Sequence, residues 1–131
     1  MFEKIFVVAA VIAISSMAQA DKDRDIQAQV AAGEKVYMSK GCYGCHGTRG
    51  EGIGDYPVLA GRSEEDLMDK LRLLRQGEGH TAKRQLMIPF AKGLTEKEMA
   101  AVTAFLARQN PHAEEDESLE TPEDILGGSD M

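Results

Sequence analysis

The sequence of 131 residues predicts an all-α fold, with three main helices joined by long loops. Three segments place apolar residues three and four positions apart, which is the spacing of one helix face. Residues 41–61 contain seven glycines and no sustained period, as is typical of a loop. Because the chain has no Trp and only 5% aromatic residues, we expect one domain with a small core.

The first helix is expected over residues 26 to about 40, where Ile26, Val30 and Tyr37 recur at helical spacing. Gly33 shares this spacing, although a glycine in a helix interior costs about 1 kcal/mol relative to alanine. We therefore expect Gly33 to lie at a close packing contact, where a larger side chain would not fit.

Two further helices are expected, and each begins with the pattern of a capping box. Ser63 precedes a helix over residues 64 to about 76, and Thr95 precedes the last helix, which ends at Asn110-Pro111. Their apolar stripes consist of Leu67, Leu71 and Leu74 in the former and Met99, Val102, Phe105 and Leu106 in the latter.

Residues 1–20 have the pattern of a cleaved secretory signal. An apolar run of ten residues covers positions 5–14, and Ala18-Gln19-Ala20 is a small-residue cleavage site. Ten helical residues span about 15 Å, roughly half of a hydrocarbon core, which disfavours the alternative of an uncleaved membrane anchor. We therefore expect export to the periplasm, a folded domain over residues 21–110, and no stable membrane insertion after cleavage.

The net charge of −7 is concentrated at the C-terminal end of the chain. Residues 111–131 contain eight acidic residues and no Lys or Arg, so we expect a disordered acidic tail. Over residues 21–110, 14 basic residues nearly balance 13 acidic ones. This balance does not favour nucleic-acid binding.

The most specific motif is Cys-x-x-Cys-His at Cys42, Cys45 and His46. This spacing is that of covalent haem c attachment, in which two thiols add to the haem vinyl groups and the adjacent imidazole binds the iron. Three other kinds of site use paired cysteines: a redox dithiol, a structural zinc site and a disulfide. No strand pattern precedes Cys42, and no second cysteine pair completes a zinc site, so the sequence favours haem.

A low-spin haem electron carrier also needs a second axial ligand, usually Met or His. The candidates are His80, Met87, Met99 and His112. Met99 lies on the apolar stripe of the last helix, where a methionine usually belongs to the core. We favour Met87, because we expect it in a loop that could carry its sulfur over the haem face.

From about residue 27 to residue 109 the chain resembles class I cytochromes c, small monohaem proteins of the bacterial periplasm. The resemblance rests on Gly33-x-x-x-Tyr37 before the haem motif, on Tyr56-Pro57-x-Leu-Ala-Gly61, and on Met87-Ile-Pro89 before Gly-Leu-Thr. The chain is also similar to the cytochrome subunits of sulfide-oxidising flavoproteins. The resemblance implies a cytochrome c fold around one covalent haem.

The resemblance further implies roles for individual residues. Pro57 should accept a hydrogen bond from the outer ring N–H of His46, and Gly33 and Tyr37 should pack against the last helix. The residues that hold the haem propionates stay open among Arg62, Arg75, Arg84 and Lys92.

These observations predict a one-electron carrier and not an enzyme. We expect it to accept electrons from a periplasmic dehydrogenase or quinol-oxidising complex and to pass them to a terminal acceptor. Its partners are expected to be redox proteins, with the chain acting as a monomer. One alternative is a fixed cytochrome subunit of an oxidoreductase complex, such as a sulfide-oxidising flavocytochrome. Another is a peroxidase or ligand sensor with an open sixth site, which Met87 disfavours.

Overall fold

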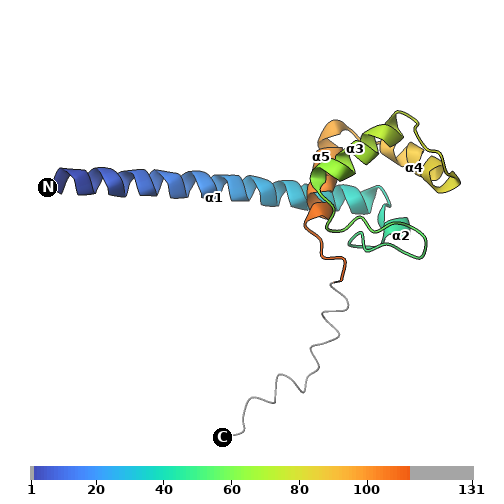
Figure 1. Ribbon diagram of the computed structural model, residues 1–131, viewed down its shortest axis with the longest axis horizontal. Coiled ribbons are helices and arrows are strands. Elements are labelled where there is room, and N and C mark those ends of the chain that lie inside the picture. Colours follow the sequence, from blue (N-terminus) through green and yellow to red (C-terminus); the bar gives the residue numbers. More distant parts are fainter. Residues whose placement is uncertain (1, 113–131) are drawn as a thin grey trace, which may run out of the picture.

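A computed structural model describes the chain over residues 2–112, with side chains from residue 17 onward. In this range every regular element is a helix, which confirms the all-α prediction (Figure 1). The helices are α1 (Phe2–Ser39), α2 (Tyr43–His46), α3 (Glu64–Arg75), α4 (Ala82–Lys92) and α5 (Glu96–Ala107). All but the first two residues of the expected tail, 111–131, lie outside the described residues.

Helix α1 begins much earlier than the expected residue 26 and runs without a break from Phe2. No glycine or proline precedes Gly33, so nothing in the sequence interrupts the backbone hydrogen bonds of the helix. The expected cleavage site thus lies within a helical segment, and cleavage of residues 1–20 stays a prediction. Among the described residues, no helix combines the length and the apolar character needed to cross a membrane.

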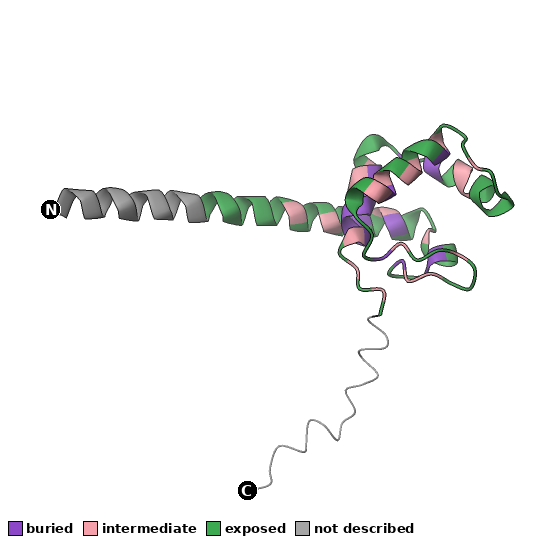
Figure 2. Cartoon of the chain, viewed as in Figure 1, coloured by how far each residue is buried: buried purple, intermediate pink, exposed green. Residues whose placement is uncertain are grey.

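The core forms where α1 crosses α5 and α3 covers the crossing, and the buried residues gather there (Figure 2). A β-carbon on Gly33 would lie only 1.9 Å from the backbone oxygen of Ala101, so the glycine allows the two helices to touch. The rings of Tyr37 and Phe105 follow at 5.5 Å between centroids. The expected packing of Gly33 and Tyr37 on the last helix is confirmed.

Helices α3 and α5 begin at the expected caps. The Ser63 hydroxyl accepts a hydrogen bond from the backbone N–H of Asp66, and Thr95 forms a complete capping box with Glu98. The Asp66 carboxylate forms ion pairs with Arg62 and Lys70, which hold its pKa below the ordinary value.

Helix α4 corrects the sequence analysis, because the segment that carries Met87 was expected to be a loop. The Thr81 hydroxyl caps this helix by accepting from the backbone N–H of Arg84. Pro89 lies in its last turn, so the ring removes only one late backbone hydrogen bond, that to the carbonyl of Gln85. The described fold therefore has four long helices and the short α2, instead of three main helices.

Candidate haem site

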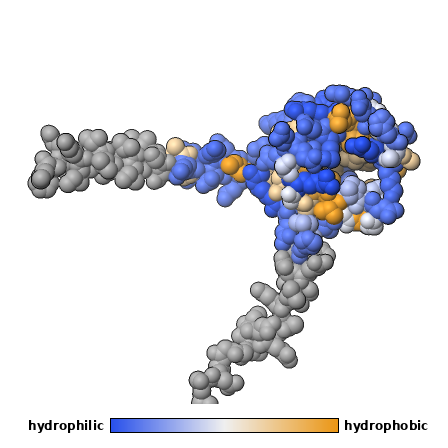
Figure 3. Space-filling model, in the orientation of Figure 1, coloured by the Kyte–Doolittle hydropathy of each residue, from blue (hydrophilic) through white to orange (hydrophobic). Residues whose placement is uncertain are grey.

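A cavity of about 450 Å³ opens between α2 and the following loop on one side and α3 and α4 on the other. Its walls are mainly apolar, and Figure 3 shows apolar surface around the hollow in the globular part. The apolar walls include Leu67, Leu71 and Leu74 of α3, Leu86 and Phe90 of α4, and Leu106 of α5. A volume of this size lies within the range of cofactor sites.

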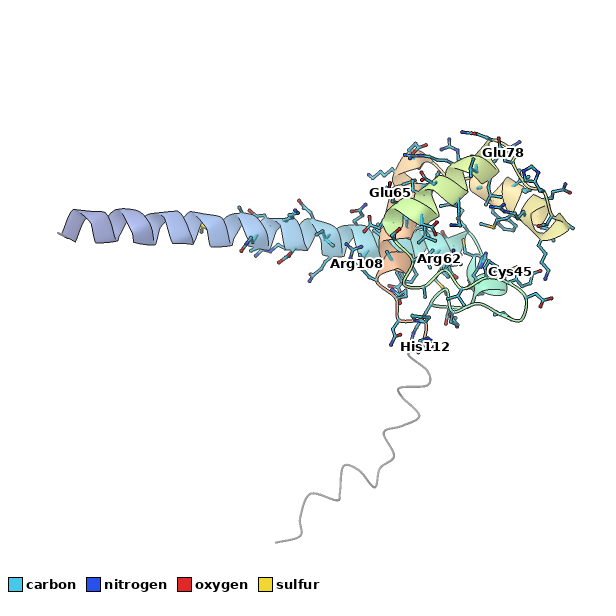
Figure 4. All side chains as sticks on the ribbon, viewed as in Figure 1. Cys45, Arg62, Glu65, Glu78, Arg108 and His112 are labelled. Carbon is cyan, nitrogen blue, oxygen red and sulfur yellow. The ribbon has the colours of Figure 1, made fainter. Side chains whose placement is uncertain are left out.

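Both cysteines of the motif line this cavity. Gly41, with a φ of +75°, turns the chain after α1, and α2 then carries Cys45 and His46 into the site. Cys42 is half-buried, and Cys45, labelled on α2 in Figure 4, is exposed. Neither thiol is in a disulfide, and burial is the main cause that raises the pKa of Cys42.

His46 is the one buried basic side chain at this site. Its Nδ1 lies 3.1 Å from the carbonyl oxygen of Pro57, and the ring of Tyr56 stands edge-on at 6.3 Å. If Nδ1–H donates to this carbonyl, Nε2 carries the lone pair and can bind a metal. The Pro57 carbonyl thus orients the imidazole, and it favours the tautomer with the proton on Nδ1, since a carbonyl oxygen can only accept.

Of the four candidates for the second axial ligand, only Met87 lines the cavity. It is half-buried on α4. Met99 is fully buried in α5, where its Sδ lies 3.4 Å from Nη1 of Arg75, and it does not face the cavity. His80 and His112 are exposed and also lie outside the cavity lining.

Only two of the four candidates for holding the haem propionates line the cavity. Arg62 and Arg84 line it, whereas Arg75 pairs with Glu96 at 2.9 Å and Lys92 lies elsewhere on α4. Three lysines that no sequence signal indicated also line the cavity, namely Lys40, Lys70 and Lys83. Lys83 precedes Met87 by one turn of α4, a relation that the expected loop did not indicate.

These residues fit haem c. Two free thiols and an imidazole with an available nitrogen share an apolar cavity, which is the donor set that covalent haem requires. Within residues 17–112, by contrast, no three His, Cys, Asp or Glu side chains come together as a metal-binding group of the kind a zinc site uses.

Comparison with known proteins gives the same result. The family described as cytochrome c matches residues 30–110. Cytochrome c-554(548) of Halomonas halodenitrificans is 35% identical over 80 residues, which cover 60% of this chain and 94% of that protein. Cytochrome c-554(547) of Halothiobacillus neapolitanus is 33% identical over 59% of this chain and 92% of its own length.

A third similarity covers a smaller part of a longer protein. The thiosulfate dehydrogenase electron acceptor of Stutzerimonas stutzeri is 36% identical over 50% of this chain and 31% of its own length.

The family match covers most of the folded part, and Cys42, Cys45 and His46 form the motif for covalent haem c. The chain therefore belongs to the cytochrome c family and is a monohaem electron carrier.

Proposed function

We propose that this cytochrome carries single electrons in the periplasm between a dehydrogenase or quinol-oxidising complex and a terminal acceptor, with His46 and Met87 as axial ligands. The observation that carries the proposal is the shared cavity, which the Cys42, Cys45 and His46 motif enters from α2 and Met87 from α4. When bound, haem supplies a one-electron couple whose potential a thioether ligand raises relative to a second imidazole.

The residues around the site favour electron transfer over catalysis. The Pro57 carbonyl holds the His46 ring in one orientation, so the ligand does not have to reorganise when the charge changes. The apolar walls exclude water and lower the local dielectric constant. With Met87 occupying the sixth position, no substrate can reach the iron.

The name of one relative supports the class of electron donor that we propose. One relative is named as an electron acceptor of thiosulfate dehydrogenase. That name supports a dehydrogenase as the class of donor, and the secretory pattern of residues 1–20 supports the periplasm as the compartment. A fixed subunit of an oxidoreductase complex would instead co-purify with its partner chains from native cells.

Carbon monoxide binding and the Met87→Ala variant test the ligand assignment. The reduced wild-type holoprotein should resist carbon monoxide, and the oxidised protein should show a thioether-to-iron charge-transfer band in the far red. Met87→Ala should abolish this band and admit carbon monoxide, whereas the matched variant Met99→Leu should keep it. Loss of the band in Met99→Leu, with the band kept in Met87→Ala, would show that the assignment is wrong. An open wild-type site that binds carbon monoxide would favour the ligand-sensor or peroxidase alternative.

A further inference from the structure

We propose that Lys83 acts as a clasp across the haem cavity, by holding the helix of the distal ligand to the loop that positions His46. The inference rests on the proposed binding of Met87, since Lys83 precedes Met87 by one helical turn on α4. Lys83 is then a positioning residue, which sets how often the sixth position opens.

The contacts of Lys83 reach from one wall of the cavity to the other. Its Nζ lies 3.0 Å from a carboxylate oxygen of Asp55 and 5.5 Å from the centroid of the Tyr56 ring. Asp55, Tyr56 and Lys83 all line the cavity, although they are 27 or 28 positions apart in the chain. One ammonium group thus combines an ion pair with a cation–π contact on the facing loop.

The loop end of this clasp connects directly to the proximal ligand. Tyr56 stands edge-on to the His46 ring, and the next residue, Pro57, offers the carbonyl that the ring nitrogen contacts. Lys83 therefore touches the same short segment that orients His46. Lys83 therefore connects the helix that carries Met87 to the loop that positions His46, and this connection does not involve the haem.

Besides its packing on α3, helix α4 makes few polar contacts with the rest of the described chain. It lies at the end of the globular part away from the N-terminal half of α1, and it packs mainly on α3 (Figure 1). Its C-terminal end is held by Lys40, whose Nζ donates to the backbone oxygen of Gly93 at 3.3 Å. Among the described residues, no other α4 side chain makes a hydrogen bond or ion pair to the loop after α2.

Two other cations of the cavity lining do not reach α4. Lys70 pairs with Asp66 within α3, and Arg62, from the loop after α2, pairs with the same carboxylate. Removing the Lys83 side chain should therefore loosen α4 from the loop after α2, while the contacts of that loop with α1 and α5 should stay in place.

Imidazole binding to the oxidised holoprotein measures the opening directly. At high imidazole concentration the stopped-flow rate reaches a plateau set by dissociation of the distal ligand. Lys83→Gln and Asp55→Asn should each raise this plateau about two- to tenfold, as expected for an exposed ion pair with a cation–π contact. Lys83→Arg keeps the charge and should restore most of the wild-type rate. The control Lys92→Gln removes the same charge from the same helix outside the cavity, and should have no effect.

Two further results decide between a clasp and a general effect of charge. The double variant Lys83→Gln/Asp55→Asn should open no faster than the faster single variant, and the plateau of the wild type should rise with salt more than that of Lys83→Gln. Plateau rates equal to the wild type in both single variants would overturn the proposal.

Hydrogen exchange of the α4 backbone amides tests the clasp independently of which residue binds the iron. Lys83→Gln should speed exchange of these amides in the holoprotein about two- to tenfold, whichever residue binds the iron. If Met87→Ala kept the far-red band while Lys83→Gln still loosened α4, the ligand assignment would fail and the clasp would stand. Unchanged exchange in α4 would overturn the clasp alone.

Discussion

Replacing Gly33 by alanine tests the helix crossing on which the haem cavity is built. An added β-carbon would lie 1.9 Å from the Ala101 oxygen and 2.8 Å from the β-carbon of Phe105. Since ordinary contact begins at 3.4 Å, α1 and α5 would have to separate by about 1.5 Å. The obstacle is backbone, so no side-chain rotation can relieve it.

Two opposing effects determine how much Gly33→Ala changes the free energy of unfolding. Alanine gains about 1 kcal/mol of helix propensity over glycine. Overpacking of a rigid contact costs up to about 3 kcal/mol, which leaves a net loss of about 2 kcal/mol in the free energy of unfolding. For a domain of this size, that loss corresponds to a melting temperature about 8–16 °C lower.

Denaturant unfolding of the holoprotein, followed by far-UV circular dichroism, measures this loss. The matched control is Gly93→Ala, where the added β-carbon would meet only ordinary contacts at 3.5 Å and the backbone φ of −78° suits alanine. We expect the control to change stability by less than about 0.5 kcal/mol. A Gly33→Ala protein as stable as the wild type, or a control equally damaged, would refute the reasoning.

Three other predictions concern the haem bonds, a buried hydroxyl and the acidic tail. Cys42→Ala or Cys45→Ala should sharply reduce holoprotein, and haem staining of denaturing gels should show the covalent bond in the wild type alone. Tyr37→Phe removes the 2.6 Å hydrogen bond to the Gly47 oxygen and should cost about 1–3 kcal/mol of unfolding free energy near neutral pH. Because burial raises the pKa of Tyr37 above its ordinary 10.0, the folded state keeps the proton, and its stability contribution should fall above pH 10 in the wild type but not in Tyr37→Phe. Deletion of residues 113–131 should leave the haem spectrum intact but slow electron transfer with a native partner at low salt, and overlapping rate–salt curves for the two proteins would leave the tail without this role.

Much of the scaffold could be predicted from local sequence signals. Ser63 and Thr95 begin α3 and α5 because a hydroxyl before a helix accepts one of its first backbone N–H groups. Gly33 indicated a close contact because a helix-interior glycine needs a packing reason. These signals act within four residues, so they can be read without knowing the tertiary structure.

Helix α4 could not be predicted in the same way, because Pro89 suggested a loop. A proline in a helix interior costs about 3 kcal/mol, but the cost depends on its position along the helix. Pro89 lies in the last turn, after a segment of good helix formers that Thr81 caps. The pairing of Lys83 with Asp55 was also hidden, because it joins residues 28 positions apart.

The two walls of the cavity are anchored differently, and this difference explains which part of the site the sequence revealed. On the proximal side, the Tyr37 hydroxyl donates to the Gly47 oxygen, and the backbone N–H of Gly61 donates to the Leu106 oxygen at 3.0 Å. The loop that orients His46 is thereby fixed to the α1–α5 core at both ends. The distal helix α4 is held mainly by α3 and by two exposed lysines.

A covalent motif that spans five residues carries its chemistry in its own spacing, so Cys42, Cys45 and His46 could be identified directly. The distal position depends instead on where a separate helix comes to lie, and the sequence could only offer candidates for it. Because an exposed ion pair contributes little free energy, the weaker anchoring of α4 should place ligand exchange on the side of Met87, the ligand that we propose. In this proposal the covalent bonds to Cys42 and Cys45 would keep the haem in place, so substitutions at Lys83 should change the opening of the site without releasing the cofactor.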